Sequence, residues 1–161
     1  MTEKDHLVTT IEREFPITLK VLRAYPPAKS ELKPSPKSKT ARELAHAFVF
    51  DAKGCEMTLD GALQLDNMPP LGATLADEIA TYDTLQRRFV ERLKHTADQA
   101  LNQTVKFMTG PKQMGDMRKI DVLWWLLMDS VHHRGQMSVY LRLADAKVPS
   151  IYGPSADESW R

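Results

Sequence analysis

The chain has 161 residues, of which 42% are hydrophobic and 27% are charged. This composition is typical of one globular domain with a single core, so we expect one domain over residues 1–161. The 22 Lys and Arg residues nearly balance the 21 Asp and Glu residues, which gives a net charge of +1. That balance excludes a general attraction to nucleic acid or to an anionic membrane, and we expect neither as a partner.

The cellular compartment is indicated by the N-terminus and by cysteine usage. No apolar run approaches the roughly 20 residues of a membrane span. The segment Met1–His6 is charged and lacks the apolar stretch of a signal peptide. Cys55 is the single cysteine, so a disulfide within the chain is excluded. These features fit the reducing cytoplasm, where we expect the protein.

Hydrophobic residues recur at spacings of three and four in the first half of the chain, which predicts helices. The first predicted helix runs from Thr2 to Ala24, and Pro16 should kink or split it. The second runs from Ala41 to about Leu59. It follows Thr40-Ala-Arg-Glu43, which has the pattern of a capping box.

The second half contains two more predicted helices and a less regular segment between them. The third helix starts after Thr74 and ends near His95, and the fourth runs from about Met117 to Asp145. Between them we expect a short helix near residues 98–103 and then a short extended piece around residues 105–108. The sequence therefore predicts an all-α fold, a four-helix bundle with this short irregular or extended segment between helices three and four. Loops of about ten residues or more permit crossover connections.

The most informative segment is Asp129-Ser-Val-His-His-Arg-Gly-Gln136, inside the fourth predicted helix. Asp129 and His133 are four residues apart, so their side chains leave the same helix face one turn apart. A carboxylate oxygen and an imidazole nitrogen at this spacing can converge on one divalent cation. With His46 from the second helix they would form three protein ligands, which leaves a position open for water or substrate.

Simpler interpretations of the same residues remain open. Asp129 and His133 can form an ordinary hydrogen-bonded pair on a partly solvated face, and a lone histidine such as His46 is usually a core or surface residue. Nothing in the local sequence joins His46 to Asp129. His132 is three residues from Asp129, so it is an alternative ligand to His133. Spacing alone does not decide among these alternatives.

Three segments resemble a known family. These are His-His-Arg-Gly-Gln-Met-Ser-Val-Tyr-Leu-Arg (132–142), Lys-Val-Pro-Ser-Ile-Tyr-Gly-Pro-Ser-Ala-Asp-Glu (147–158) and Pro-Ser-Pro-Lys-Ser-Lys-Thr-Ala-Arg-Glu-Leu-Ala-His (34–46). The chain is similar to the DinB/YfiT-like family of metalloenzymes over nearly its whole length. The first segment carries the most specific part of the resemblance.

The resemblance implies a four-helix bundle with a divalent metal ion, zinc or nickel, held by His46, Asp129 and His133. Many members have histidine where this chain has Asp129. Characterised relatives include transferases and isomerases that depend on a low-molecular-weight thiol, whose deprotonation a bound cation would favour. Relatives are often homodimers, and the family name comes from induction by DNA damage.

Three functional hypotheses follow. The first is a metal-dependent transferase that uses a low-molecular-weight thiol, with hydrolysis as a less favoured reaction. The second is a non-catalytic, stress-associated metal-binding protein. The third is a protein-interaction helical module without metal, whose polar cluster is closed by further carboxylates that turn inward, such as Asp51, Asp83 or Asp121.

Overall fold

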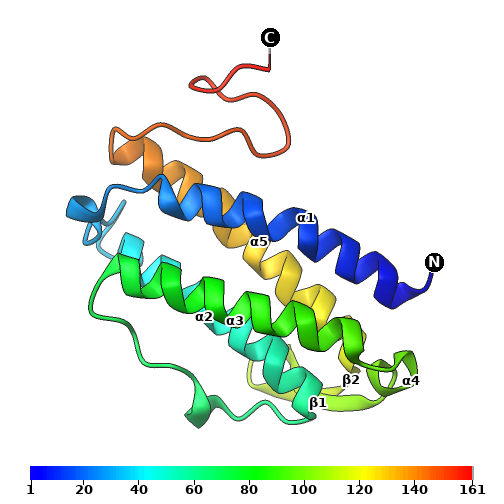
Figure 1. Ribbon diagram of the computed structural model, residues 1–161. Helices are drawn as coiled ribbons and strands as arrows, with labels where there is room; N and C mark the ends of the chain where they lie inside the picture. The colour runs from blue at the N-terminus through cyan, green and yellow to red at the C-terminus, as the bar shows by residue number, and fades with distance from the viewer. Residues whose placement is uncertain (161) are drawn as a thin grey trace.

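Four long helices form the framework of the fold, as the computed structural model of residues 1–160 shows (Figure 1). They are α1 (Glu3–Arg23), α2 (Ala41–Asp60), α3 (Leu75–His95) and α5 (Lys119–Leu143). The shorter elements are η1 (Pro27–Lys29), η2 (Leu65–Asn67) and α4 (Asp98–Leu101). The predicted all-α bundle is confirmed, with helix ends within two residues of those expected. None of the helices in residues 1–160 has the length and apolar character needed to cross a membrane.

The helices are arranged so that consecutive ones are not always neighbours. α1 packs mainly against α3 and α5, and α2 packs mainly against the same two helices. The first two helices therefore occupy opposite corners of the bundle, and the loop of residues 24–40 crosses between them. The Ala41 and Arg42 amides donate to the carbonyls of Leu32 and Ser30, which fastens this loop to the start of α2.

The segment between α3 and α5 holds a β-hairpin in place of the single extended piece that was predicted. β1 (Thr104–Gly110) pairs antiparallel with β2 (Gln113–Arg118), and Phe107 lies opposite Gly115. The second strand was missed because it is polar and exposed, so it lacks the apolar alternation of a half-buried strand. Phe107 is buried in the core, and this anchors the hairpin to the bundle.

Pro16 neither splits nor ends α1, which is continuous from Glu3 to Arg23. Of the two predicted effects, a kink or a split, the split does not occur, because losing one backbone hydrogen bond does not stop a helix whose two halves bury one continuous apolar stripe. Ile11, on the N-terminal side of the proline, and Leu19, on its C-terminal side, are both buried. The expected capping box is confirmed: Thr40 Oγ1 accepts from the Glu43 amide, and the Glu43 carboxylate accepts from the Thr40 amide.

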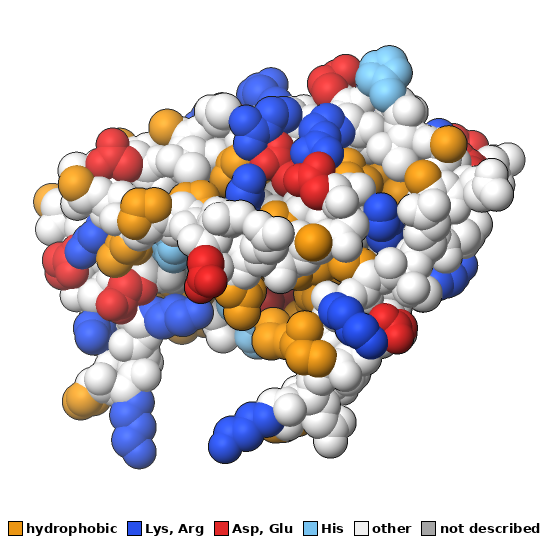
Figure 2. Space-filling view, turned by 90° about the horizontal axis from the view of Figure 1, so that it is seen from below, with side chains coloured by type: hydrophobic (Ala, Val, Ile, Leu, Met, Phe, Trp, Pro, Cys, Tyr) orange, Lys and Arg blue, Asp and Glu red, His pale blue; other side chains and the backbone are white. Residues whose placement is uncertain are grey.

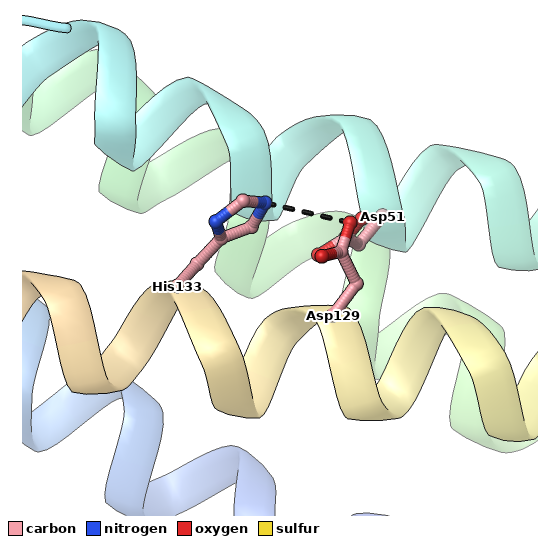
Figure 3. A group of neighbouring side chains, drawn as sticks. All are labelled: Asp51, Asp129 and His133. Carbon is pink, nitrogen blue, oxygen red and sulfur yellow. Dashed lines mark ion pairs between the residues drawn. The ribbon is translucent and has the colours of Figure 1, made fainter. Parts of the chain in front are cut away.

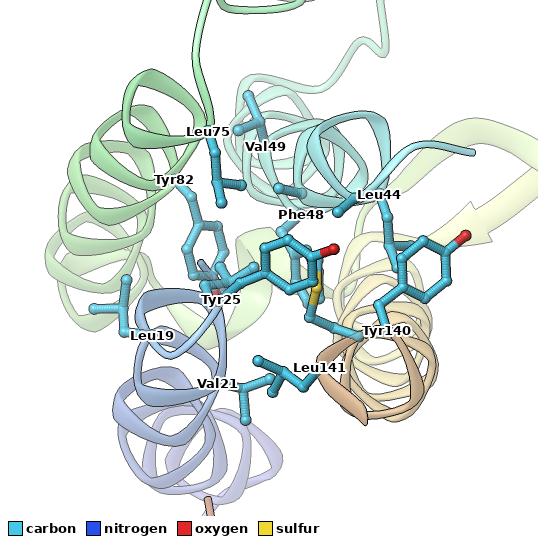
Figure 4. Close-up of a cluster of buried hydrophobic side chains, with 14 of the residues drawn as sticks. Leu19, Val21, Tyr25, Leu44, Phe48, Val49, Leu75, Tyr82, Tyr140 and Leu141 are labelled. Carbon is cyan, nitrogen blue, oxygen red and sulfur yellow. The ribbon is translucent and has the colours of Figure 1, made fainter. Parts of the chain in front are cut away.

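The core consists of two apolar clusters, one toward each end of the bundle. Figure 4 shows the first, in which Phe48, Tyr82 and Leu141 point into the space between the helices. The second lies nearer the hairpin and includes Phe89 and Leu123. α2 and α5 approach closely beside them, because a Cβ atom on Gly54 would lie 3.3 Å from Leu126 Cδ1.

Polar side chains from all four long helices lie around a small cavity between these clusters. Its volume is about 20 Å³, and Glu14, Asp51, Gln86 and Ser130 contribute to its lining. A cavity of this size has room for one water molecule. Within residues 1–160, no buried side-chain nitrogen or oxygen lacks a hydrogen-bond partner. The polar layer is therefore a satisfied part of the bundle.

Arg134 ties α5 to α1 through a buried ion pair. Its guanidinium is 1% exposed, and Nη2 lies 2.6 Å from Glu14 Oε2 while Nη1 donates to Thr18 Oγ1. Tyr152 in the C-terminal segment also donates to Glu14 Oε2, at 2.6 Å. Burial alone would raise the pKa of Glu14, but the hydrogen bonds from Tyr152 and Arg134 outweigh it and hold that pKa below its usual value.

We expect Arg134→Ala to lower the free energy of unfolding by about 3–5 kcal/mol, because the Glu14 carboxylate would stay buried without its cation. Urea denaturation followed by circular dichroism measures this loss. The control is Lys106→Ala, which removes an exposed ion pair to Asp116 and should change stability little. Equal losses in the two variants would contradict the structural role of Arg134.

Candidate metal centre

Asp129 and His133 lie one turn apart on α5 and face the same side, as their spacing predicts. His133 Nε2 is 3.5 Å from Asp129 Oδ2, and His133 is the less exposed of the two side chains. The His133 ring packs edge-on against Phe48 of α2, with 5.9 Å between the ring centroids. This apolar contact fixes the ring where α5 meets α2.

Asp51 of α2 completes a group of three potential ligands (Figure 3). One ligand atom from each of Asp51, Asp129 and His133 can be chosen so that all three lie within 4.8 Å of one another. All three side chains line one pocket, but Asp51 is only 3% exposed, whereas Asp129 and His133 are partly exposed. The group therefore joins two helices, with one ligand buried between them and two on α5.

Burial and mutual repulsion set the protonation of this group. Asp51 Oδ2 accepts a hydrogen bond from Ser130 Oγ at 2.8 Å. Burial raises the pKa of Asp51 to about 8, although this hydrogen bond opposes the shift, and the negative charge of Asp129 raises it further. Burial lowers the pKa of His133 despite the neighbouring Asp129 carboxylate. Without a cation, the site thus favours a protonated Asp51 and a neutral His133.

His46 lines the same pocket but is not among the three clustered side chains. Its Nδ1 lies 2.9 Å from Glu78 Oε2 of α3, and the other Glu78 oxygen accepts from the Gly72 amide. A carboxylate that orients one ring nitrogen and leaves the other free is the usual arrangement around a metal-binding histidine. The assignment of His46 as a ligand stays a prediction, and its surroundings are compatible with it.

The other polar residues of the 129–136 segment have different partners. His132 Nε2 lies 3.0 Å from Gln136 Nε2, and Gln136 Oε1 lies 3.3 Å from His133 Nδ1. Gln136 thus contacts both histidines and can orient the His133 ring. His132 lies outside the three-residue group, so the geometry favours His133 over His132 as the ligand.

An open pocket of about 720 Å³ lies above the candidate ligands. Its lining includes His46, Asp51, Asp129 and His133, together with Phe50 and several residues of the 33–39 loop. Figure 2 shows that the underside of the molecule is hollowed between two projecting segments, with hydrophobic side chains around the hollow. The pocket volume of about 720 Å³ lies in the range of pockets that bind small molecules.

The three side chains fit a divalent cation. Ligand bonds of roughly 2.0–2.2 Å place neighbouring donor atoms about 3–4 Å apart, so the 3.5 Å between His133 and Asp129 fits directly, and small rotations would bring in Asp51. Two carboxylates would neutralise the ion, and the imidazole is neutral. With Asp51 the set has two oxygen donors, where His46, Asp129 and His133 would have only one. This makes the site harder and admits manganese beside zinc and nickel.

From the sequence, Asp51 was predicted only as one of several carboxylates that would close the polar cluster, not as a ligand. A signal was present in the sequence. Asp51 follows Leu44 and Phe48 by seven and three residues and precedes Cys55 by four, so it lies on the apolar face of its helix. A carboxylate on a buried face requires a partner, and the structure supplies one on α5.

We expect Asp51→Asn to stabilise the metal-free protein much more at pH 8.5 than at pH 5. Between the usual pKa of 3.8 and about 8, folded Asp51 holds a proton that the unfolded chain has released, so stability falls as pH rises through this window. Asparagine removes this penalty and still accepts from Ser130. The melting temperature, measured with a chelator, should rise by several degrees at the higher pH, at roughly 2–4 °C per kcal/mol.

The control for this experiment is Asp66→Asn, a carboxylate on the exposed η2 turn. It should leave the pH dependence of melting unchanged. A difference between Asp51→Asn and the wild type that is the same at both pH values would contradict the buried, protonated state of Asp51.

Comparison with known proteins shows which family the chain belongs to. The DinB family profile matches residues 1–160. The chain is 26% identical over 159 residues to the uncharacterized protein YrdA of Bacillus subtilis strain 168, which covers 96% of this chain and 90% of YrdA. The match extends over almost the whole of both chains.

Two solved structures share the fold. A DinB-like protein from Bacillus cereus ATCC 10987 gives a TM-score of 0.76 at 21% identity, over 92% of this chain and 97% of that one. YfiT from Bacillus subtilis, described as "a probable metal-dependent hydrolase with an unusual four-helix bundle topology", gives 0.68 at 13% identity over 89% of each chain. At these identities the likeness concerns the fold alone. Together with the profile match over residues 1–160, these findings show that the chain belongs to the DinB family.

Proposed function

We propose that the protein is a metalloenzyme whose divalent cation is held by Asp51, Asp129 and His133, with His46 as a further ligand. The observation that carries this proposal is the convergence of the three side chains from α2 and α5 at the bottom of an open pocket. A divalent cation bound there would act as a Lewis acid and would lower the pKa of a water or thiol that enters the pocket.

Some residues of the proposed site would hold the cation, and others would orient the ligands. Asp51 is buried and accepts a hydrogen bond from Ser130, so it would anchor the centre, whereas Asp129 and His133 are the more exposed ligands on the pocket side. Gln136 orients the His133 ring, and Glu78 orients His46. Three or four protein ligands leave room for a reacting group on the pocket side, which is the arrangement of catalytic rather than closed structural sites.

Transfer of a substrate group to a low-molecular-weight thiol is the favoured reaction. The pocket of about 720 Å³ is larger than a water molecule needs, and its size suits a small thiol together with a second substrate. Hydrolysis is the second candidate, because YfiT, which shares the fold, is described as a probable metal-dependent hydrolase. A non-catalytic metal-binding role would use the same ligands, and activity assays separate it from both reactions.

A contact surface for the expected homodimer lies beside the site. Trp125 and Met128 on α5 are about half exposed, and they line a shallow surface depression together with Trp124 and Asp129. An exposed group of large apolar side chains is typical of an interaction surface. This face would also suit the partner of a protein-interaction module.

We expect near-stoichiometric metal in the tag-free wild-type protein, after incubation with zinc, nickel or manganese, by inductively coupled plasma mass spectrometry. Asp51→Ala and His133→Ala should each lose most of it, because each removes a donor. His132→Ala is the matched control, since its ring lies outside the group, and it should keep the metal. Metal loss in His46→Ala would add that residue to the ligands. Absence of metal from the wild type would contradict the proposal.

We expect metal-loaded protein to consume a low-molecular-weight thiol in the presence of one of a panel of electrophiles, as followed by thiol titration and mass spectrometry of the conjugate. The rate should fall to the uncatalysed level with a chelator and in His133→Ala. Product formation without thiol consumption would identify hydrolysis instead. If neither reaction depends on metal, the non-catalytic interpretation would replace the enzymatic one.

A further inference from the structure

Three lysines, Lys33, Lys37 and Lys39, line the pocket above the candidate metal centre. Within residues 1–160, no carboxylate lies within ion-pair distance of any of them. Most lysines elsewhere are paired with an acidic side chain; these are Lys4, Lys20, Lys29, Lys53, Lys94 and Lys106. In residues 1–160, three of the six lysines without an ion-pair partner therefore line the pocket that contains all the candidate ligands; the other three are Lys112, Lys119 and Lys147.

Hydrogen bonds hold the lysine-bearing loop in place. The Ser38 amide donates to the Ser35 carbonyl at 3.0 Å, which closes a turn around Lys37. The Tyr140 hydroxyl of α5 donates to the Lys39 carbonyl at 2.8 Å. With the Ala41 to Leu32 bond, these contacts fasten the loop at both ends. The lysines are therefore presented to the pocket by ordered backbone.

The charge of the loaded pocket is positive. Asp51 and Asp129 balance a divalent cation, and Glu43, which also borders the pocket, balances one lysine. About two positive charges remain. Glu43 is itself occupied by the Thr40 amide, at 2.6 Å, so it is not free to pair closely with a lysine.

The backbone at the start of α2 does not supply this positive character. The amides of Ala41 and Arg42 donate to the 30–32 segment, and the Glu43 amide donates to Thr40. An anion that enters the pocket would contact the ammonium groups of Lys33, Lys37 and Lys39, which are carried on flexible side chains. Lysine binds carboxylate and phosphate in this way, as a point charge.

We propose that Lys33, Lys37 and Lys39 bind a carboxylate or phosphate group of the substrate, so that the enzyme acts on small anionic molecules. This inference rests on the proposed function, because it assumes that a cation neutralises the two aspartates below. The reacting end of the substrate lies at the centre, and its anionic end lies against the 33–39 loop. Substrates that lack such a group would bind more weakly.

The test uses cobalt-loaded protein, whose visible spectrum reports a thiol that reaches the metal. The probes are 3-mercaptopropionate, which carries a carboxylate, and 2-mercaptoethanol, which is neutral. We expect at least tenfold tighter binding of the anionic thiol at low salt, with a smaller preference at high salt because of screening. Competition by inorganic phosphate and by succinate then shows which anion the lysines prefer.

The decisive comparison is between two triple variants that lose the same charge. Lys33→Gln/Lys37→Gln/Lys39→Gln should bind the two thiols with a ratio at least fivefold smaller than the wild type. Lys106→Gln/Lys112→Gln/Lys147→Gln, with all three changes outside this pocket, should keep the wild-type ratio. Equal changes in both variants, or no preference in metal-loaded wild type, would overturn this inference and leave the proposed function standing. Failure of the wild type to bind cobalt would overturn both.

Discussion

The contact between α2 and α5 is the constraint on which the candidate site depends. Gly54 allows the two helices to approach closely, and Phe48 packs on the His133 ring across the same interface. In this contact the Asp51 carboxylate is buried opposite Asp129. Burying a carboxylate next to another is costly unless a proton or a cation compensates. The apolar packing of the bundle must offset that cost. A divalent cation bound between the two aspartates would remove the cost by compensating their charge.

The residues of the 129–136 segment serve different purposes although they are contiguous. Asp129 and His133 face the pocket, whereas Arg134 turns to the opposite side of α5 and is buried against Glu14 of α1. Arg134 therefore fixes α5 in the bundle, and this in turn fixes the position of the ligands on its other face. Gly135 has no neighbouring atoms that would exclude a side chain, so close helix packing does not explain it.

The pocket combines opposite charges at different depths. Its floor carries carboxylates that suit a cation, and its rim carries lysines that suit an anion. The two are separated because the floor belongs to the helices and the rim to the loop before α2. An arrangement of this kind can hold a metal ion and still attract an anionic substrate, since the ion cancels the charge of the floor. The loop that crosses the bundle from α1 to α2 thus contributes to the chemistry as well as to the topology.

The sequence by itself determined the local features. The periodicity of apolar residues predicted the long helices, the Thr40 pattern predicted a helix start, and the spacing of Asp129 and His133 predicted that they share a face. These follow from interactions over three or four residues. The hairpin and the continuity of α1 through Pro16 could not be predicted in this way, because they depend on burial against residues distant in the sequence.

Only the tertiary structure decided which helices face each other, and therefore which side chains complete the site. Asp51 and Asp129 are 78 positions apart, and no local pattern joins them; they meet because α2 and α5 pack together across the bundle. The packing of α3 against α2 set Glu78 against His46, and the loop between α1 and α2 placed residues 33–39 over the pocket. Such long-range contacts depend on how the apolar faces of whole helices pack together. That packing is determined by many residues acting at once, so no short sequence pattern reveals it.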